Sequence, residues 1–322
     1  MKRSTKAILA YLIAYLPLFP VIWGMTAYYN WQRLRGFPIV KRRFRRKAGY
    51  ELDLDNPTSL NQKLTHRKLF CRDPIWIEVT DKVAVRDWLR RNNLLGEDLR
   101  LIPALGVFRT ARQLHKAKLP QRCIIKAAWA SGRNAIIEKG VDQTPNLADD
   151  IQRWMLESPT YRYQSLIWPA WHIPRRLVVE EFLADEDGNP PRDIKFFVFH
   201  GRVRFFYILS DRLQGRKTKF YNRNLDVLDV RSVSPTSPDS RLPENIDRVI
   251  AAAEAIGRFF DFARVDLYSH NGAVYFGEIT QTPNNGEAAF HPEAFDFEAG
   301  TYWDYPRGQP GIEPAAASGA AS

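Results

Sequence analysis

Two apolar runs near the C-terminal end of the chain constrain its fold most, because charged residues interrupt both. The runs cover residues 263–268 and 273–280, and the residues between them have the composition of a turn. Arg264 and Asp266 lie in the first run and Glu278 lies in the second. A β-hairpin with three charges on half-buried strands needs a reason for those charges, since unpaired buried charge is costly.

The register of this hairpin decides whether the three charges share a face. A two-residue turn would place Glu278 opposite Val265, facing away from Asp266. A three-residue loop ending in a left-handed Gly272 would place Glu278 opposite Arg264 and diagonal to Asp266. We predict the second arrangement, with all three charged groups on one face.

Two carboxylates and a guanidinium on one face fit a particular chemistry. Carboxylate oxygens are ligands for Mg²⁺ that bridges nucleotide phosphates, and a guanidinium binds a transferred phosphoryl or acyl oxygen. The alternative is a structural salt bridge between Arg264 and one of the two acids.

A further strand is predicted over residues 122–127, and a loop of small residues follows it. Lys126 lies near the end of the strand, and Ser131, Gly132 and Asn134 lie in and after the loop. Such a loop can donate backbone N–H groups to phosphates while the lysine adds a point charge. A surface hairpin explains the same pattern, because the loop matches no established phosphate-binding motif.

Two more predicted strands carry charges. Glu180 and Glu181 interrupt an apolar strand at 177–183, where they could accept hydrogen bonds from a purine amino group or ribose hydroxyls. Exposed acids at the end of a strand are the alternative. Alternation over residues 192–199 places Asp193 and Lys195 on one face and apolar residues on the other. A solvated sheet edge is the alternative for this second pair.

The N-terminal part indicates a membrane. Residues 7–31 carry no charge and are long enough for a span of about 20 apolar residues, although Pro17 and Pro20 interrupt them. A kinked span is our expectation, and a re-entrant helix is the alternative. Six of the seven residues at 41–47 are basic, which favours an anionic membrane surface and places the folded domain at the cytoplasmic face of the inner (plasma) membrane.

Composition excludes several other classes. The net charge is +11, but no nucleic-acid recognition motif accompanies the basic cluster, so nucleic acid is not an expected partner. Only two cysteines are present, and no histidine or cysteine has ligand spacing, which argues against structural zinc and disulfides.

The whole chain reads as an α+β protein. Helices are predicted over 59–70, 80–92 and 243–260, and hairpins among the strands exclude an all-parallel sheet. We therefore expect two α+β lobes that grip a ligand. The predicted organisation is a membrane segment at 1–31, a basic linker at 32–55, a catalytic domain at 56–305 and a disordered tail at 306–322.

Taken in order, several segments resemble the TupA-like ATP-grasp family, named for an enzyme of teichuronopeptide synthesis. The resemblance covers most of the chain, from about residue 54 to 300. The segments that carry it are 56–63, 80–86, 125–126, 179–181, 193–197, 264–268 and 276–280.

The resemblance implies an ATP-grasp fold with ATP and Mg²⁺ as cofactors. It implies that Lys126 and Lys195 contact nucleotide phosphates and that Glu180 and Glu181 lie at the adenine and ribose. It further assigns Ser131, Gly132, Asn134 and Asp193 to the nucleotide site, Asp266 and Glu278 to magnesium, and Arg264 to the acyl phosphate.

The chain departs from the family pattern at two positions. Many ATP-grasp enzymes have asparagine two residues after the metal-binding glutamate, where this chain has Thr280. The ligands of a second metal ion are then open, and Asn284 or Asn285 are the candidates. Family members often have glutamate at the position of Gln62.

The function implied is a ligase that activates a carboxylate as an acyl phosphate and joins it to an amine. Small-molecule or saccharide substrates of cell-surface polysaccharide synthesis are the expected partners. The alternatives are an ATP-dependent kinase or other polysaccharide-modifying transferase on the same fold, or a non-catalytic membrane-bound scaffold.

Overall fold

A computed structural model describes residues 19–140, 146–156, 166–184, 188, 190–210, 217–232, 234–237 and 241–305. Much of the predicted membrane segment and the whole predicted tail lie outside these residues. The chain divides into two compact units, each with one sheet. The first unit comprises residues up to Pro38, Ile77–Asn92 and Ile102–Ala184, and the second comprises Ile39–Trp76, Asn93–Leu101 and the residues from Asp185.

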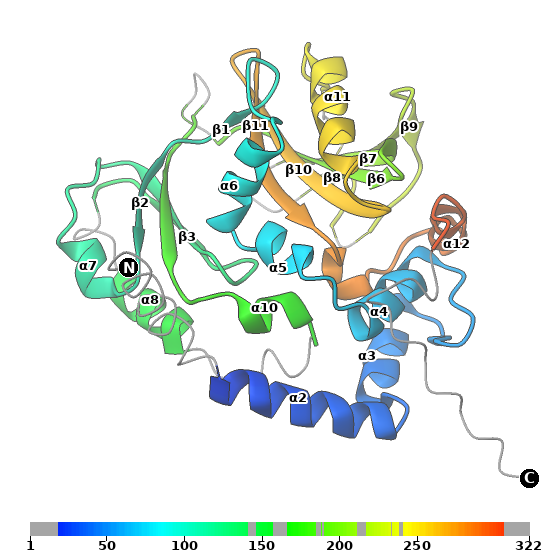
Figure 1. The fold of residues 1–322 in the computed structure, drawn as a ribbon. Coiled ribbons are helices and arrows are strands. Elements are labelled where there is room, and N and C mark those ends of the chain that lie inside the picture. The colour runs from blue at the N-terminus through cyan, green and yellow to red at the C-terminus, as the bar shows by residue number, and fades with distance from the viewer. Residues whose placement is uncertain are drawn as a thin grey trace, which may run out of the picture. The chain divides into compact units, whose positions relative to one another are not determined.

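The first unit contains a four-stranded antiparallel sheet. In spatial order its strands are β2 (Ala104–Phe108), β5 (Leu177–Glu181), β3 (Cys123–Ala127) and β4 (Asn134–Ile137). Figure 1 shows this sheet beside the helices α7 (Ala111–His115) and α8 (Leu147–Leu156). One face is buried with these two helices, because Ile125 and Val179 pack in one cluster with Leu114 and Ile151. Alternation along β3 places Lys126 on the other face.

The second unit contains a seven-stranded sheet, parallel only between its first two strands in spatial order. These strands are β1 (Arg100–Leu101), β11 (Ala273–Thr280), β10 (Phe262–His270), β6 (Asp193–Phe199), β7 (Arg202–Ser210), β8 (Lys217–Asn222) and β9 (Val227–Leu228). Helix α11 (Ile246–Gly257) packs on one face through buried Val249, Ile250 and Ile256. The contact is close, since a Cβ on Gly257 would lie 2.2 Å from Val198.

The opposite face of the same sheet is half covered. Phe197, Phe205 and Phe262 pack in a buried cluster with Leu60 and Trp303. Helices α4 (Leu60–Phe70) and α12 (Ala294–Thr301) contribute to this cover. The remaining part of the face carries the charged residues of β6, β10 and β11.

Six further helical elements complete the described part of the chain. They are α2 (Phe19–Leu34), α3 (Pro38–Ala48), α5 (Ile75–Thr80), α6 (Ala84–Arg91), α10 (Trp168–His172) and the 3₁₀ turn η3 (Pro283–Gly286). Within the described part of the chain, no helix combines the length and apolar character needed to cross a membrane. Helix α3 lies within the segment 32–55 that was predicted as a basic linker.

Two helices predicted from the sequence are confirmed, and a third is shorter than predicted. Helix α4 begins where the pattern indicated, with Ser59 as its N-cap and Gln62 completing a capping box. Gln62 thus fulfils the capping role with an amide oxygen, which accepts from the backbone of Ser59 at 3.2 Å. The predicted helix over 80–92 is α6 alone, because α5 ends at Thr80.

A buried carboxylate joins α12 to the start of α4. Asp296 accepts hydrogen bonds from the backbone N–H of Asn61 (3.0 Å), from the Asn61 side chain (2.6 Å) and from the hydroxyl of Tyr50 (2.5 Å). Its side chain is almost fully excluded from solvent. Burial nevertheless raises the pKa of Asp296 to about 6, because these hydrogen bonds offset only part of the desolvation.

We predict a pH-dependent contribution of Asp296 to stability. The carboxyl has a higher pKa folded than unfolded, so the folded state holds the proton more tightly between pH 4 and 6. The stabilisation is complete below pH 4 and is lost as the pH rises through about 6. The free energy of unfolding then changes by about 3 kcal/mol. Urea unfolding of the wild type and Asp296→Asn at pH 4 and pH 7 measures it. An equal difference between the two proteins at both pH values would contradict the prediction.

Candidate functional site

The hairpin of β10 and β11 has a two-residue turn, so the predicted three-residue loop is wrong. Asn271 and Gly272 both have left-handed backbones, with φ of 48° and 71°, and form the tight turn that suits two twisted strands. The extra residue instead lies within the strand at Gly277. The register shifts there, and Glu278 comes to lie directly opposite Asp266.

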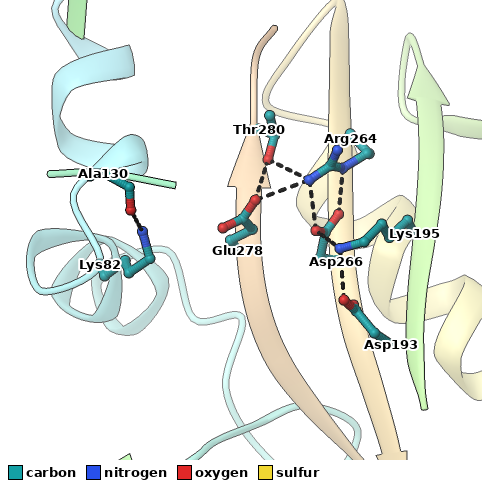
Figure 2. Close-up of polar contacts among 8 residues, drawn as sticks. All are labelled: Lys82, Ala130, Asp193, Lys195, Arg264, Asp266, Glu278 and Thr280. Atoms are coloured by element: carbon teal, nitrogen blue, oxygen red, sulfur yellow. Dashed lines mark hydrogen bonds and ion pairs between the residues drawn. The ribbon is translucent and has the colours of Figure 1, made fainter. Parts of the chain in front are cut away.

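This bulge brings the three charged groups onto one face, as predicted. A Cβ at Gly277 would lie 2.8 Å from the carbonyl oxygen of Asp266, so the close approach of the two strands requires glycine. With Asp266 opposite Glu278 and Arg264 opposite Thr280, these four side chains meet in one network (Figure 2).

Arg264 is the centre of that network. Its Nε and one Nη bind the two oxygens of Asp266 at 2.7 and 2.8 Å, and the same Nη donates to Glu278 and Thr280 at 3.0 Å each. Thr280 also donates to Glu278 at 2.7 Å. The hydroxyl of Thr280 is therefore part of the network, because it contacts both Arg264 and Glu278.

Strand β6 adds a lysine to the same face. The Nζ of Lys195 lies 2.8 Å from Asp193 and also donates to Asp266, as Figure 2 shows. Burial alone would lower the pKa of Lys195, but Asp193 and Asp266 outweigh it and raise that pKa. Asp266 likewise raises the pKa of buried Arg264. Both cations remain charged at neutral pH.

The donor set fits a hard divalent cation. Mg²⁺ takes only one or two protein carboxylates and completes its shell with water and phosphate oxygens. Asp266 and Glu278 supply two carboxylates from adjacent strands, and Asp266 Oδ1 accepts a hydrogen bond from Arg264 Nε. Among the described residues no group of three His, Cys, Asp or Glu side chains could hold a metal ion. A cation here would therefore depend on oxygens from a ligand.

The structure does not bring the third predicted metal residue into this network. Asn284 is exposed in η3, with a left-handed backbone (φ 49°). Its neighbour Asn285 donates to Glu287 at 2.8 Å, in a buried ion cluster with Lys68 and Arg43. The roles of both asparagines toward a metal stay predictions.

The sequence prediction missed Tyr207. This residue of β7 lies directly opposite Lys195, on the charged face. Burial raises the pKa of its phenol, while Arg264 and Lys195 act in the opposite direction. The sequence indicates β7 as an apolar strand, but its extra residue Arg204, opposite the step from Phe197 to Val198, decides that Tyr207 and not Phe206 meets the lysine.

In the first unit, the structure brings Lys126 and Glu180 into contact, a pair that the sequence analysis did not predict. The Nζ of Lys126 lies 2.5 Å from one oxygen of Glu180, and Arg86 lies 3.0 Å from the other. Arg86 was not predicted to contact this acid. Glu181 follows Glu180 on the strand, so it faces the opposite side of the sheet and is exposed.

The predicted small-residue loop joins β3 to β4. Ser131, Gly132 and Asn134 are exposed, and Gly132 has φ of 70°. The loop is held by Lys82, whose Nζ donates to the carbonyl of Ala130 at 2.8 Å (Figure 2). The assignment of this loop to phosphates remains a prediction.

Comparison with solved structures finds D-alanine–D-alanine ligases and an L-amino acid ligase. D-alanine–D-alanine ligase from Bacillus anthracis complexed with ATP shares 14% identity, covering 64% of this chain and 56% of that one, with a TM-score of 0.37. L-amino acid ligase from Bacillus licheniformis shares 14%, covering 65% and 42%, with a TM-score of 0.37. D-alanine–D-alanine ligase from Helicobacter pylori shares 9%, covering 76% and 69%, with a TM-score of 0.41.

This chain thus spans about half the length of the first two ligases. At these TM-scores the likeness carries no argument about activity. No curated protein matches the chain significantly. A family description of the TupA-like ATP-grasp type, in contrast, matches residues 62–303, which include both sheets, the Arg264 network and the Lys126–Glu180 pair. The chain belongs to the TupA-like ATP-grasp family.

Proposed function

We propose that the protein is an ATP- and Mg²⁺-dependent ligase that activates a carboxylate as an acyl phosphate and joins it to an amine. The observation that carries this proposal is the network of Arg264 with Asp266 and Glu278 on one sheet face. Membership in the ATP-grasp family supports ATP as the nucleotide, and the network places a fixed cation beside two carboxylates. The substrates proposed are an amine and a carboxylate-bearing saccharide of cell-surface polysaccharide synthesis.

The residues have distinct roles in this proposal. Arg264 is held by Asp266, so its charge is already oriented when negative charge develops on the transferred phosphoryl group. Lys195 is held in the same way between Asp193 and Asp266 and would contact a phosphate. Asp266 and Glu278 would hold Mg²⁺, which supplies charge neutralisation of the phosphates. In the first unit, Lys126 would contact phosphate and Glu180 would lie at the adenine or ribose, with Arg86 fixing the carboxylate.

A substrate screen tests the reaction. Purified protein with MgATP is assayed for ADP release against amino acids, with and without uronic-acid saccharides. We expect ADP release only when a carboxylate and an amine are both present, with an amide-linked product by mass spectrometry. Release of ADP with a phosphorylated saccharide and no amide would instead support the kinase alternative.

We further predict that Asp266→Ala and Glu278→Ala each abolish MgATP binding in calorimetric titration, because each removes half of the proposed carboxylate pair. Asp296→Asn, which changes a buried carboxylate outside the network, serves as the matched control and is expected to bind. If the wild type itself fails to bind MgATP, the non-catalytic scaffold is favoured. Unchanged binding in both alanine variants would remove these residues from the metal site.

A further inference from the structure

Helix α2 has two faces of different character. Met25, Tyr29 and Gln32 are buried, with exposed fractions of 0 to 6%. The opposite face carries large apolar side chains that are exposed to solvent. These are Phe19 (60%), Trp23 (77%), Trp31 (43%) and Leu34 (88%).

These four side chains lie along one side of the helix, which also carries the exposed Asn30. At 100° per residue, Phe19, Trp23, Trp31 and Leu34 fall within one third of the helix circumference, opposite the buried residues. No residue from 19 to 32 is charged. Solvent-exposed helix surfaces are normally polar, so an aromatic stripe without charge indicates an apolar partner.

The buried face determines how this helix can meet a bilayer. It lies against the protein, with α10 in contact, so Met25 and Gln32 are not available to lipid. A helix that crosses a bilayer exposes its circumference to lipid or to other spanning helices. Helix α2 can present only its aromatic side, which requires that it lie in the plane of the membrane surface.

Basic residues follow the stripe directly. Arg35 lies over the ring of Trp31, with its guanidinium carbon 5.1 Å from the ring centre. Helix α3 begins at Pro38, four residues after α2 ends, and buries Val40 and Phe44. Its exposed side is strongly basic. The exposed basic residues of α3 are Lys41, Arg42, Arg45, Arg46 and Lys47.

We propose that α2 binds an anionic membrane surface side-on, with Trp23 and Trp31 at the headgroup level, and that the basic residues at 41–47, which follow α2 closely in the sequence, add attraction to lipid phosphates. Tryptophan is favoured at this depth because its ring is apolar and its N–H is polar. Charge complementarity selects an anionic bilayer over an uncharged protein surface. This inference stands apart from the ligase reaction and replaces the span expected from sequence with a peripheral contact.

Vesicle co-sedimentation of the full chain tests the proposal. Vesicles of equal parts phosphatidylcholine and phosphatidylglycerol are expected to bind the protein, and vesicles of phosphatidylcholine alone to bind it less. Trp23→Ala should weaken binding about tenfold, because a large apolar side chain leaves the interface. Arg42→Gln/Arg46→Gln should weaken binding to the anionic vesicles and reduce its dependence on salt.

Matched controls separate this site from general stickiness. Phe259→Ala removes another exposed aromatic (48% exposed), and Lys116→Gln/Lys118→Gln removes two exposed cations elsewhere. Both should bind as the wild type does. Vesicle binding that is unchanged by Trp23→Ala would overturn the proposal and assign membrane contact to residues 1–18. Protein that cannot be extracted from the vesicles at alkaline pH would overturn it in the same way. No vesicle binding at all would assign the stripe to a protein partner.

Discussion

Arg264→Met is expected to lower substrate-dependent ADP release per folded molecule by about 10²–10³-fold, while MgATP binding is retained. The guanidinium is oriented by Asp266 before any ligand arrives, so its contribution lies mainly in stabilising developing negative charge. Methionine keeps the length of the side chain without the charge. Initial rates with substrates found by the screen, together with calorimetry, provide the measurement.

The same substitution also removes a buried cation, which is expected to destabilise the fold by about 3 kcal/mol. Arg67→Met is the control for that effect. Arg67 is equally buried, pairs with Asp261 and lies 4.3 Å from the ring centre of Trp303, outside the charged network. It should lose stability but keep its rate per folded molecule. If both variants lose rate equally, Arg264 is structural and its proposed role in the reaction fails.

Gly277→Ala is expected to weaken MgATP binding and to destabilise the second unit by about 1–3 kcal/mol. A Cβ at this position meets the carbonyl oxygen of Asp266 at 2.8 Å and the ring of Tyr268 at 3.1 Å. The strands must move apart there, which separates Glu278 from Asp266. Urea unfolding and calorimetric titration of MgATP measure the two effects.

Gly272→Ala provides the comparison within the same hairpin. Gly272 has φ of 71° but no atom within 4 Å of an added Cβ, so its replacement costs about 1 kcal/mol of backbone strain and leaves the network in place. MgATP binding should then be unchanged. Equal losses of binding in both variants would mean that the bulge does not set the geometry of the carboxylates.

The sequence predicted the grouping of the charges but not the way it arises. Arg264, Asp266 and Glu278 share a face as expected, yet the extra residue lies at Gly277 and not in the turn. Asn271 with Gly272 is itself a strong signal for a two-residue turn. The position of the bulge depends on how closely Gly277 approaches the backbone of Asp266. This is a contact between two strands, and no local sequence pattern reveals it.

Other parts of the candidate site were beyond sequence reasoning for the same reason. Arg86 reaches Glu180 across 94 positions of sequence, and no local pattern connects them. Tyr207 faces Lys195 only because the β6–β7 ladder also carries a bulge. Alternation within one strand, in contrast, sufficed for Asp193 and Lys195, and helical periodicity sufficed for α4 and α11.

The irregular positions in the β6–β7 and β10–β11 ladders have a practical consequence for comparing this chain with its relatives. Each ladder gains one residue between its turn and its charged segment, so counting outward from the turn assigns the wrong partner to Lys195 and to Asp266. Relatives whose turns differ in length can therefore keep the same chemistry, provided the glycine before the glutamate is kept. Alignments of the family are best anchored on Gly277 and Glu278, and gaps belong in the turns.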